Sequence, residues 1–293
     1  MEHKFILSCE STVDLPYSYV TSRDIPVLFY TYQIEGEEFY DDMLRDEKAL
    51  PLFYKNIEEG KLPSTSQINE FRYYDYLEEL VKKGDVLHLC LSSGLTPSVK
   101  NAEKAAASLM EKYPDRKIIV VDSLCACSGF GLLMDNAADL RDEGKTLDEV
   151  AAYVEENKIK IQSQFFSTDM TMFKRSGRVS GVAALAASVL GICPMMHLDN
   201  NGKIEAYRKV RGVNNVIAET VKSIVENFDS TGINNKIFIA NSNCPELAWE
   251  VKKLLEAENL TDDIRIFDIG TIIASHCGKG TVATFFNGKT REV

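Results

Sequence analysis

Short runs of apolar, often β-branched residues alternate with longer segments of helical periodicity through the first half of the chain. The runs predicted to be strands are 4–8, 25–32, 85–92 and 117–123, and the segments predicted to be helices are 69–83, 97–113, 125–143 and 146–157. Thr146 to Glu149 reads T-L-D-E, a capping box that marks a helix start. Strands that alternate with helices build βαβ units, in which a parallel sheet carries helices on both faces. The first half is therefore predicted to be a three-layer α/β/α domain.

The second half of the chain has a different pattern. Predicted strands are 162–168, 195–198, 204–210, 236–241, 264–269 and 281–286, with helices at 182–190, 213–227 and 245–258. Asp199-Asn200-Asn201-Gly202 joins two of these strands as a hairpin, which requires an antiparallel pair and predicts a mixed sheet. The length of 293 residues fits two domains. We expect an N-terminal α/β domain over 1–157 and a C-terminal α/β domain with a mixed sheet over 158–293.

The charge balance excludes some partners. Lys and Arg number 33 against 44 Asp and Glu, a net charge of −11, which argues against nucleic acid or an anionic membrane as the main partner. The longest uncharged run, 179–198, contains glycines and a proline and is predicted to be a buried helix and strand rather than a membrane span. The apolar run near the N-terminus is too short for a signal peptide. Seven scattered cysteines without a C-x-x-C pair indicate reduced thiols, and a cytoplasmic location is expected.

Hydroxyl side chains collect at junctions that follow predicted strands or precede a predicted helix. Ser11, Ser92-Ser93-Gly94 and Ser123 follow predicted strands, and Thr65-Ser66 precedes the predicted helix 69–83. In open α/β sheets ligands bind beyond the carboxyl ends of the strands, and free N–H groups at helix N-termini favour an anion. Each hydroxyl alone is also explained as a helix cap. Together they favour a site for a carboxylate or a phosphate.

Two further residues have open roles. His276 lies between a predicted strand end and the glycine pair Gly278 and Gly280, where loops approach ligands. Arg178 precedes the predicted helix 182–190 and is either a solvated residue or an anion contact. P-loop, dinucleotide, nucleophile-elbow and H-E-x-x-H motifs are absent from the sequence. The four histidines are far apart, and Cys125 with Cys127 supplies two ligands at most, so neither a metal site nor a cofactor is predicted.

The order of the short motifs resembles the DegV family, bacterial fatty-acid-binding proteins that serve as binding subunits of fatty acid kinase. The family motifs D-S-x-x-D-L-P, T-S-Q-P, S-S-G-L-S-G, V-D-S, G-G-R-I-S and G-x-x-x-x-x-H-x-G-P-G correspond here to 10–16, 65–68, 92–97, 121–123, 176–180 and 270–280. The sequence departs from these motifs at Glu10, Ile68, Pro97, Ser176 and Lys279.

The resemblance implies a two-domain α/β protein that holds one long-chain fatty acid and presents it to a separate ATP-dependent kinase, which makes acyl phosphate. The chain would then be a carrier and not a catalyst. The carboxylate would be held by hydroxyls and the imidazole, at Thr65, Ser66, Ser92, Ser93, Gly94 and His276. The acyl chain would occupy a tunnel lined by Val182, Leu185, Ala186 and Val189 of the small-residue helix. Arg178 and Arg211 are candidates for contact with an anion or with the kinase.

Two other functions remain open from the residues alone. A binder of another small anionic metabolite, such as a phosphorylated one, would use the same helix N-termini. An acyl hydrolase or acyltransferase would need Ser93 as nucleophile and His276 as base, although an orienting acid is not evident.

Overall fold

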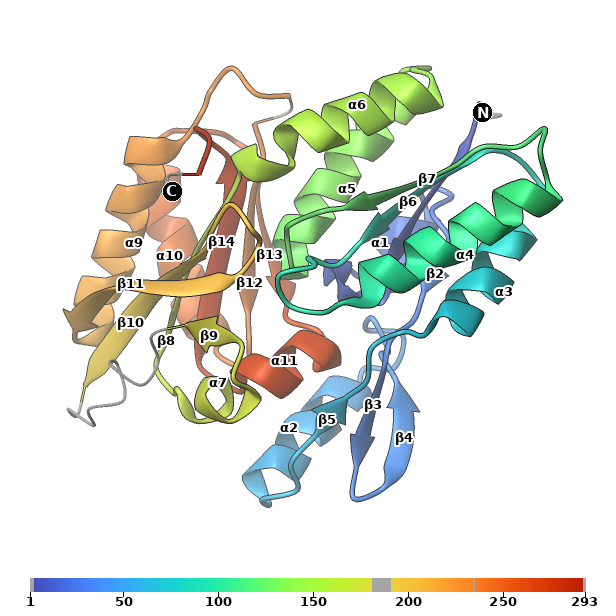
Figure 1. Ribbon diagram of the computed structural model, residues 1–293. Helices are drawn as coiled ribbons and strands as arrows, with labels where there is room; N and C mark the ends of the chain where they lie inside the picture. Colours follow the sequence, from blue (N-terminus) through green and yellow to red (C-terminus); the bar gives the residue numbers. More distant parts are fainter. Residues whose placement is uncertain (1–2, 181–190, 234, 292–293) are drawn as a thin grey trace.

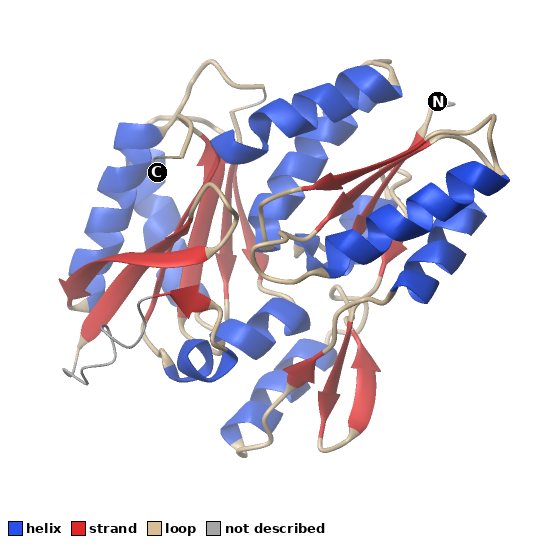
Figure 2. Cartoon of the chain, viewed as in Figure 1, coloured by secondary structure: helices blue, strands red, loops and turns tan. Residues whose placement is uncertain are grey.

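The computed structural model describes residues 3–180, 191–233 and 235–291. Two α/β halves lie side by side, and a smaller unit of strands and one helix adjoins both (Figure 1). Figure 2 shows that helices cover the strands of each half, as a layered α/β arrangement requires.

The first sheet is parallel throughout and has the order β2-β1-β6-β7. Its strands are β1 (Ile6–Glu10), β2 (Val27–Leu28), β6 (Val86–Cys90) and β7 (Ile118–Asp122). The helices α3 (Glu70–Val81) and α4 (Ser98–Lys112) pack against it, as do α5 (Cys127–Asp142) and α6 (Leu147–Asn157). The predicted capping box at Thr146 and Glu149 is confirmed at the start of α6. The parallel sheet predicted for the first half is confirmed.

The second sheet is mixed and has the order β13-β12-β14-β8-β10-β11-β9. Its strands are β8 (Ile161–Ser167), β9 (Val179–Ser180), β10 (Ile192–Leu198), β11 (Ile204–Arg211), β12 (Ile237–Asn241), β13 (Ile264–Asp268) and β14 (Thr281–Asn287). The predicted hairpin at 199–202 joins β10 to β11 in an antiparallel pair. Helices in this half are α7 (Thr171–Ser176), α9 (Val213–Asn227), α10 (Pro245–Ala257) and α11 (Thr271–Cys277). The mixed sheet is confirmed as well.

A third, antiparallel sheet of order β4-β3-β5 corrects the sequence prediction of one strand over 25–32. It consists of β3 (Thr31–Ile34), β4 (Glu37–Tyr40) and β5 (Ser64–Thr65), with α2 (Ala49–Glu58) beside it. The predicted strand is interrupted at two residues whose backbone groups bond to side chains instead of a neighbouring strand. The carbonyl of Phe29 accepts from Arg72, and the N–H of Tyr30 donates to Ser11 Oγ.

Helix α5 is buried on nearly all sides because it lies between the two large sheets (Figure 1). A Cβ atom on Gly129 would come within 2.5 Å of the Phe285 ring in β14, and one on Gly131 within 2.5 Å of the Val13 carbonyl. The absence of side chains at these two positions lets both halves pack closely on one helix. The domain boundary after Asn157 stays a prediction, because α5, a helix of the first half, also covers the second sheet.

The remaining described elements are short: α1 (Tyr17–Thr21) and the 3-10 turns η1 (Ser11–Val13) and η2 (Lys158–Lys160). Within the described ranges, no helix combines the length and the apolar character that crossing a membrane requires.

Candidate functional site

A cavity of about 410 Å³ lies where the two halves meet. Volumes of about 300–1,000 Å³ are typical of small-molecule sites. The first half contributes the loop after β6 and the start of α5. The second half contributes β8, β14, α7, α11 and the β10–β11 hairpin, and the third sheet contributes β5.

The cavity wall is mainly apolar because each element turns one regular face toward it. Strands β8 and β14 contribute alternate residues, which lie on the same side of a sheet. Helix α11 contributes Ile272, Ile273, His276 and Cys277, at the spacing of a single helix face, and Ile269 lies two residues before the helix. The other apolar wall residues are Leu91, Leu95, Pro97, Ala126, Phe165, Phe173, Leu198, Ile204, Ala283 and Phe285. Such a wall suits a hydrocarbon chain.

Polar groups converge at one end of this cavity. The Oγ1 of Thr65, on β5, lies 2.9 Å from Nε2 of His276, on α11. Ser66 and Gln67 follow Thr65 along the cavity lining, and Arg178 lies beside His276 in it. The lining therefore has a hydrogen-bonding end that can receive an anionic head group.

His276 is neutral near pH 7. Burial, with smaller contributions from Arg178 and Arg175, lowers the pKa of His276 to about 4. Its Nδ1 is buried and has no hydrogen-bond partner among the described residues. A neutral imidazole offers one donor and one acceptor, so the ring can bind a head group as well as Thr65.

A smaller recess of about 200 Å³ adjoins the polar end and shares Thr65, Arg178 and His276 with the cavity. It adds Arg175, whose Nη1 donates to the Pro63 carbonyl at 2.8 Å, and the hydroxyl residues Ser64, Ser176 and Ser275. Its two guanidinium groups make the surroundings of the polar end favourable for an anion.

The structure brings together four of the predicted site residues: Thr65, Ser66, His276 and Arg178 all line the cavity. The surroundings of His276 differ from the prediction. The sequence indicated a loop, whereas the structure has helix α11, which starts after Gly270 and ends at Gly278 with φ of +68°.

Ser92, Ser93 and Gly94 do not line the cavity and have other contacts. Ser92 Oγ donates to the Gly202 carbonyl at 2.8 Å. Gly94 packs so closely on the same hairpin that a Cβ atom would lie 2.4 Å from the Asn201 carbonyl oxygen. Ser93 is exposed, and its N–H donates to Asp122 Oδ1. The close approach that Gly94 allows is to the second half of the chain rather than to the cavity.

Two further predictions fall elsewhere. Arg211 is exposed at the end of β11, opposite Ile192, and is not among the cavity lining. The predicted tunnel residues Val182, Leu185, Ala186 and Val189 lie outside the described residues.

Sequence reasoning missed most of the apolar wall and the residues with polar groups Tyr30, Gln67, Thr96, Ser163 and Thr281. The alternation of Ser163 with Phe165, and of Thr281 with Ala283 and Phe285, signals one shared face on each strand. Which face meets a ligand depends on the packing of the two halves, and the local pattern does not contain that information.

Comparison with known proteins supports one relationship over nearly the whole chain. The sequence model of the protein family described as "Uncharacterised protein, DegV family" matches residues 4–289 of this chain. A DegV domain-containing protein of Clostridium perfringens is 38% identical, with 99% of each chain covered. One from Lactococcus lactis is 30% identical over 98% of this chain and 99% of its own.

Solved structures have the same fold. A Streptococcus agalactiae protein described as a fatty acid binding DegV family protein has a TM-score of 0.83 and 26% identity, covering 98% of this chain and 100% of its own. A Thermotoga maritima protein whose structure is described as revealing fatty acid binding has a TM-score of 0.82 and 26% identity, with the same coverage. From its motifs, its fold and these matches, the chain belongs to the DegV family.

Proposed function

We propose that this protein binds one long-chain fatty acid. The carboxylate is held at the end formed by Thr65, Ser66 and His276, and the acyl chain runs along the apolar wall. The observation that carries the proposal is the composition of the cavity, whose wall is mainly apolar and which contains the Thr65–His276 hydrogen bond together with Ser66, Gln67 and Arg178. Burial of a chain of about 16 carbons at ~0.8 kcal/mol per CH₂ supplies on the order of 10 kcal/mol before association costs. The fatty acid binding described for DegV relatives supports the same ligand class.

We also propose that the protein is a non-catalytic carrier in the cytoplasm, which presents the carboxylate to a separate ATP-dependent fatty acid kinase. Arg175 and Arg178 beside the polar end support a role for this opening in handling anions. The alternative hypothesis, an acyl hydrolase, has less support, because Ser93 is exposed and is absent from the cavity lining that contains His276.

Native mass spectrometry of the purified protein, with lipid analysis of its denatured extract, tests the ligand. We expect a bound mass in the range of a long-chain fatty acid. A bare polypeptide mass, combined with failure to bind added fatty acid, would contradict the proposal and favour a small polar anion as the ligand.

For the carrier role, we expect acyl phosphate to form from ATP only when the kinase and this protein are both present. Acyl ester hydrolysis by the protein alone would contradict that role.

A further inference from the structure

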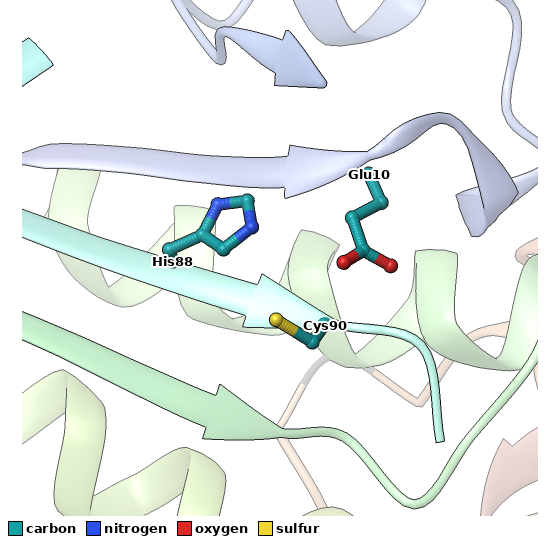
Figure 3. Close-up of side chains that lie close together, drawn as sticks. All are labelled: Glu10, His88 and Cys90. Atoms are coloured by element: carbon teal, nitrogen blue, oxygen red, sulfur yellow. The ribbon is translucent and has the colours of Figure 1, made fainter. Parts of the chain in front are cut away.

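Three side chains that can bind a metal ion lie together inside the first sheet, away from the polar end of the cavity. Glu10 comes from β1, and His88 and Cys90 come from β6 (Figure 3). Their ligand atoms all lie within 4.8 Å of one another, and all three side chains are 0% exposed.

The strand register places the three groups on one face. Strands β1 and β6 pair in parallel with Ser8 opposite His88, so Glu10, two residues later, comes beside Cys90. Alternate residues of a strand lie on the same side of a sheet, which puts these four residues on one face. The rings of Tyr73 and Tyr76, from α3, pack against His88 on this face.

The imidazole of His88 is oriented as in a metal ligand. Its Nδ1 lies 2.8 Å from Ser8 Oγ, and its Nε2 is buried without a hydrogen-bond partner among the residues that the structure describes. Figure 3 shows the free nitrogen on the ring edge that faces Glu10 and Cys90. Metal-bound histidines use one nitrogen as ligand while the other is fixed by a hydrogen bond, which is the arrangement seen here.

The cluster lacks a positive charge to balance its carboxylate. In the described part of the chain, Glu10 forms no ion pair with Lys or Arg; it accepts hydrogen bonds from the Tyr73 hydroxyl and, at 2.8 Å, from the Leu91 N–H. A buried carboxylate without a counter-charge is costly. A divalent cation bound to one carboxylate and one thiolate would leave the site neutral.

We propose that Glu10, His88 and Cys90 form a binding site for a zinc-class divalent cation. Thiolate, imidazole and carboxylate are the ligand types that Zn²⁺ takes, at about 2.0–2.3 Å. Binding releases the Cys90 thiol proton to solvent, and the Tyr73 hydroxyl is a further oxygen at the site. Leu91, whose N–H donates to Glu10, also lines the cavity, so Glu10 adjoins a residue of the cavity wall. This site is independent of the proposed lipid binding.

Titration of the chelator-treated full-length protein with Co²⁺, under a non-thiol reductant, tests the site. We expect saturation at one ion per chain, a thiolate-to-cobalt charge-transfer band and displacement by Zn²⁺. Cys90→Ser should abolish the band. Ser8→Ala should weaken binding by about 10–100-fold while it keeps the band, because it removes only the group that orients His88.

Cys9→Ala is the matched control, since Cys9 is a buried cysteine on β1, next to Glu10, but on the opposite face of the sheet. It should bind Co²⁺ like the unmodified protein. Should Cys90→Ser fail to fold, His88→Gln and Glu10→Gln provide the same comparison. A wild-type protein that shows no charge-transfer band, or a band that survives in Cys90→Ser, would overturn the proposal.

Discussion

Thr65 and His276 are 211 positions apart in the chain, yet Thr65 Oγ1 and His276 Nε2 lie 2.9 Å from each other. The two residues come from β5 of the third sheet and from α11 of the second half. A further hydrogen bond, from Thr271 Oγ1 to Asp41 Oδ1, connects α11 to the chain just after β4. The polar end of the cavity therefore forms only when the third sheet docks on α11.

Thr65→Val tests the contribution of this hydroxyl to lipid binding. Valine keeps the shape of threonine but cannot bond to His276 or to a carboxylate, and hydrogen bonds to charged groups contribute about 1.5–3 kcal/mol. We expect fatty acid affinity to fall by about tenfold or more, measured by displacement of a fluorescent fatty acid. Ser93→Ala, at an exposed position outside the cavity, is the control and should stay within about twofold. Equal losses in both variants would argue against a head-group role for Thr65.

The low pKa of His276 makes the stability of the lipid-free protein depend on pH. His276 has a pKa of about 4 in the folded protein, below its ordinary value of 6.5, so the unfolded chain binds the proton more strongly. The stability that neutral His276 contributes is present above pH 6.5 and is lost as the pH falls toward 4. The full loss in the free energy of unfolding from this one group is about 3 kcal/mol. Urea unfolding from pH 7 to pH 4 should show a smaller loss for His276→Gln than for the unmodified protein; parallel curves would contradict this assignment.

Ala283→Leu tests whether the apolar wall limits the acyl chain. Ala283 lines the cavity on β14, and a larger side chain there takes up space that a long chain would use. We expect the variant to select shorter fatty acids, which lipid analysis of the purified protein measures. Val282→Leu is the matched control, because Val282 is buried in the separate core on the other face of β14. Val282→Leu should change the stability of the protein but not the length of the fatty acid that it binds. A shift to shorter fatty acids in both variants would contradict the prediction.

The contact of the 92–94 loop with the β10–β11 hairpin predicts a stability effect. Ser92→Ala leaves the Gly202 carbonyl without its hydroxyl donor and should lower the free energy of unfolding by about 1–3 kcal/mol.

Gly94→Ala puts a Cβ atom 2.4 Å from the Asn201 carbonyl oxygen, so the backbone must move. Overpacking of this kind costs about 1–3 kcal/mol or more, measured by urea unfolding. Gly144→Ala is a control without a close contact, although its positive φ adds strain. If Gly94→Ala lowers the free energy of unfolding no more than Gly144→Ala does, the close contact between Gly94 and Asn201 does not determine the stability.

Local patterns predicted most strands of the two large sheets and their longer helices, but not α1, α2, β4, α7, β9 or α11, nor where a strand changes sheet. The run 25–32 is divided between two sheets at Phe29 and Tyr30, whose backbone groups bond to the side chains of Arg72 and Ser11. Both partner side chains are distant in sequence from the run they interrupt, so its pattern cannot reveal them.

The candidate site divides in the same way. Thr65 and His276 were predicted on motif order, and both lie at the polar end. Ser92 and Gly94 belong to an equally clear hydroxyl motif, but they contact the hairpin instead. A hydroxyl at a strand end indicates a polar contact and does not specify whether the partner is a ligand or another part of the chain.

The sequence by itself determined the parallel sheet, the mixed sheet with its hairpin and the family, because hydrophobic period, turn residues and motif order are local properties. Only the tertiary structure decided which hydroxyls meet His276, which strand faces enclose the cavity and that Glu10, His88 and Cys90 share one face. The Thr65–His276 contact alone joins residues 211 positions apart, and all of these relationships depend on strand register and on the docking of whole elements. Neither leaves a local signal in the sequence.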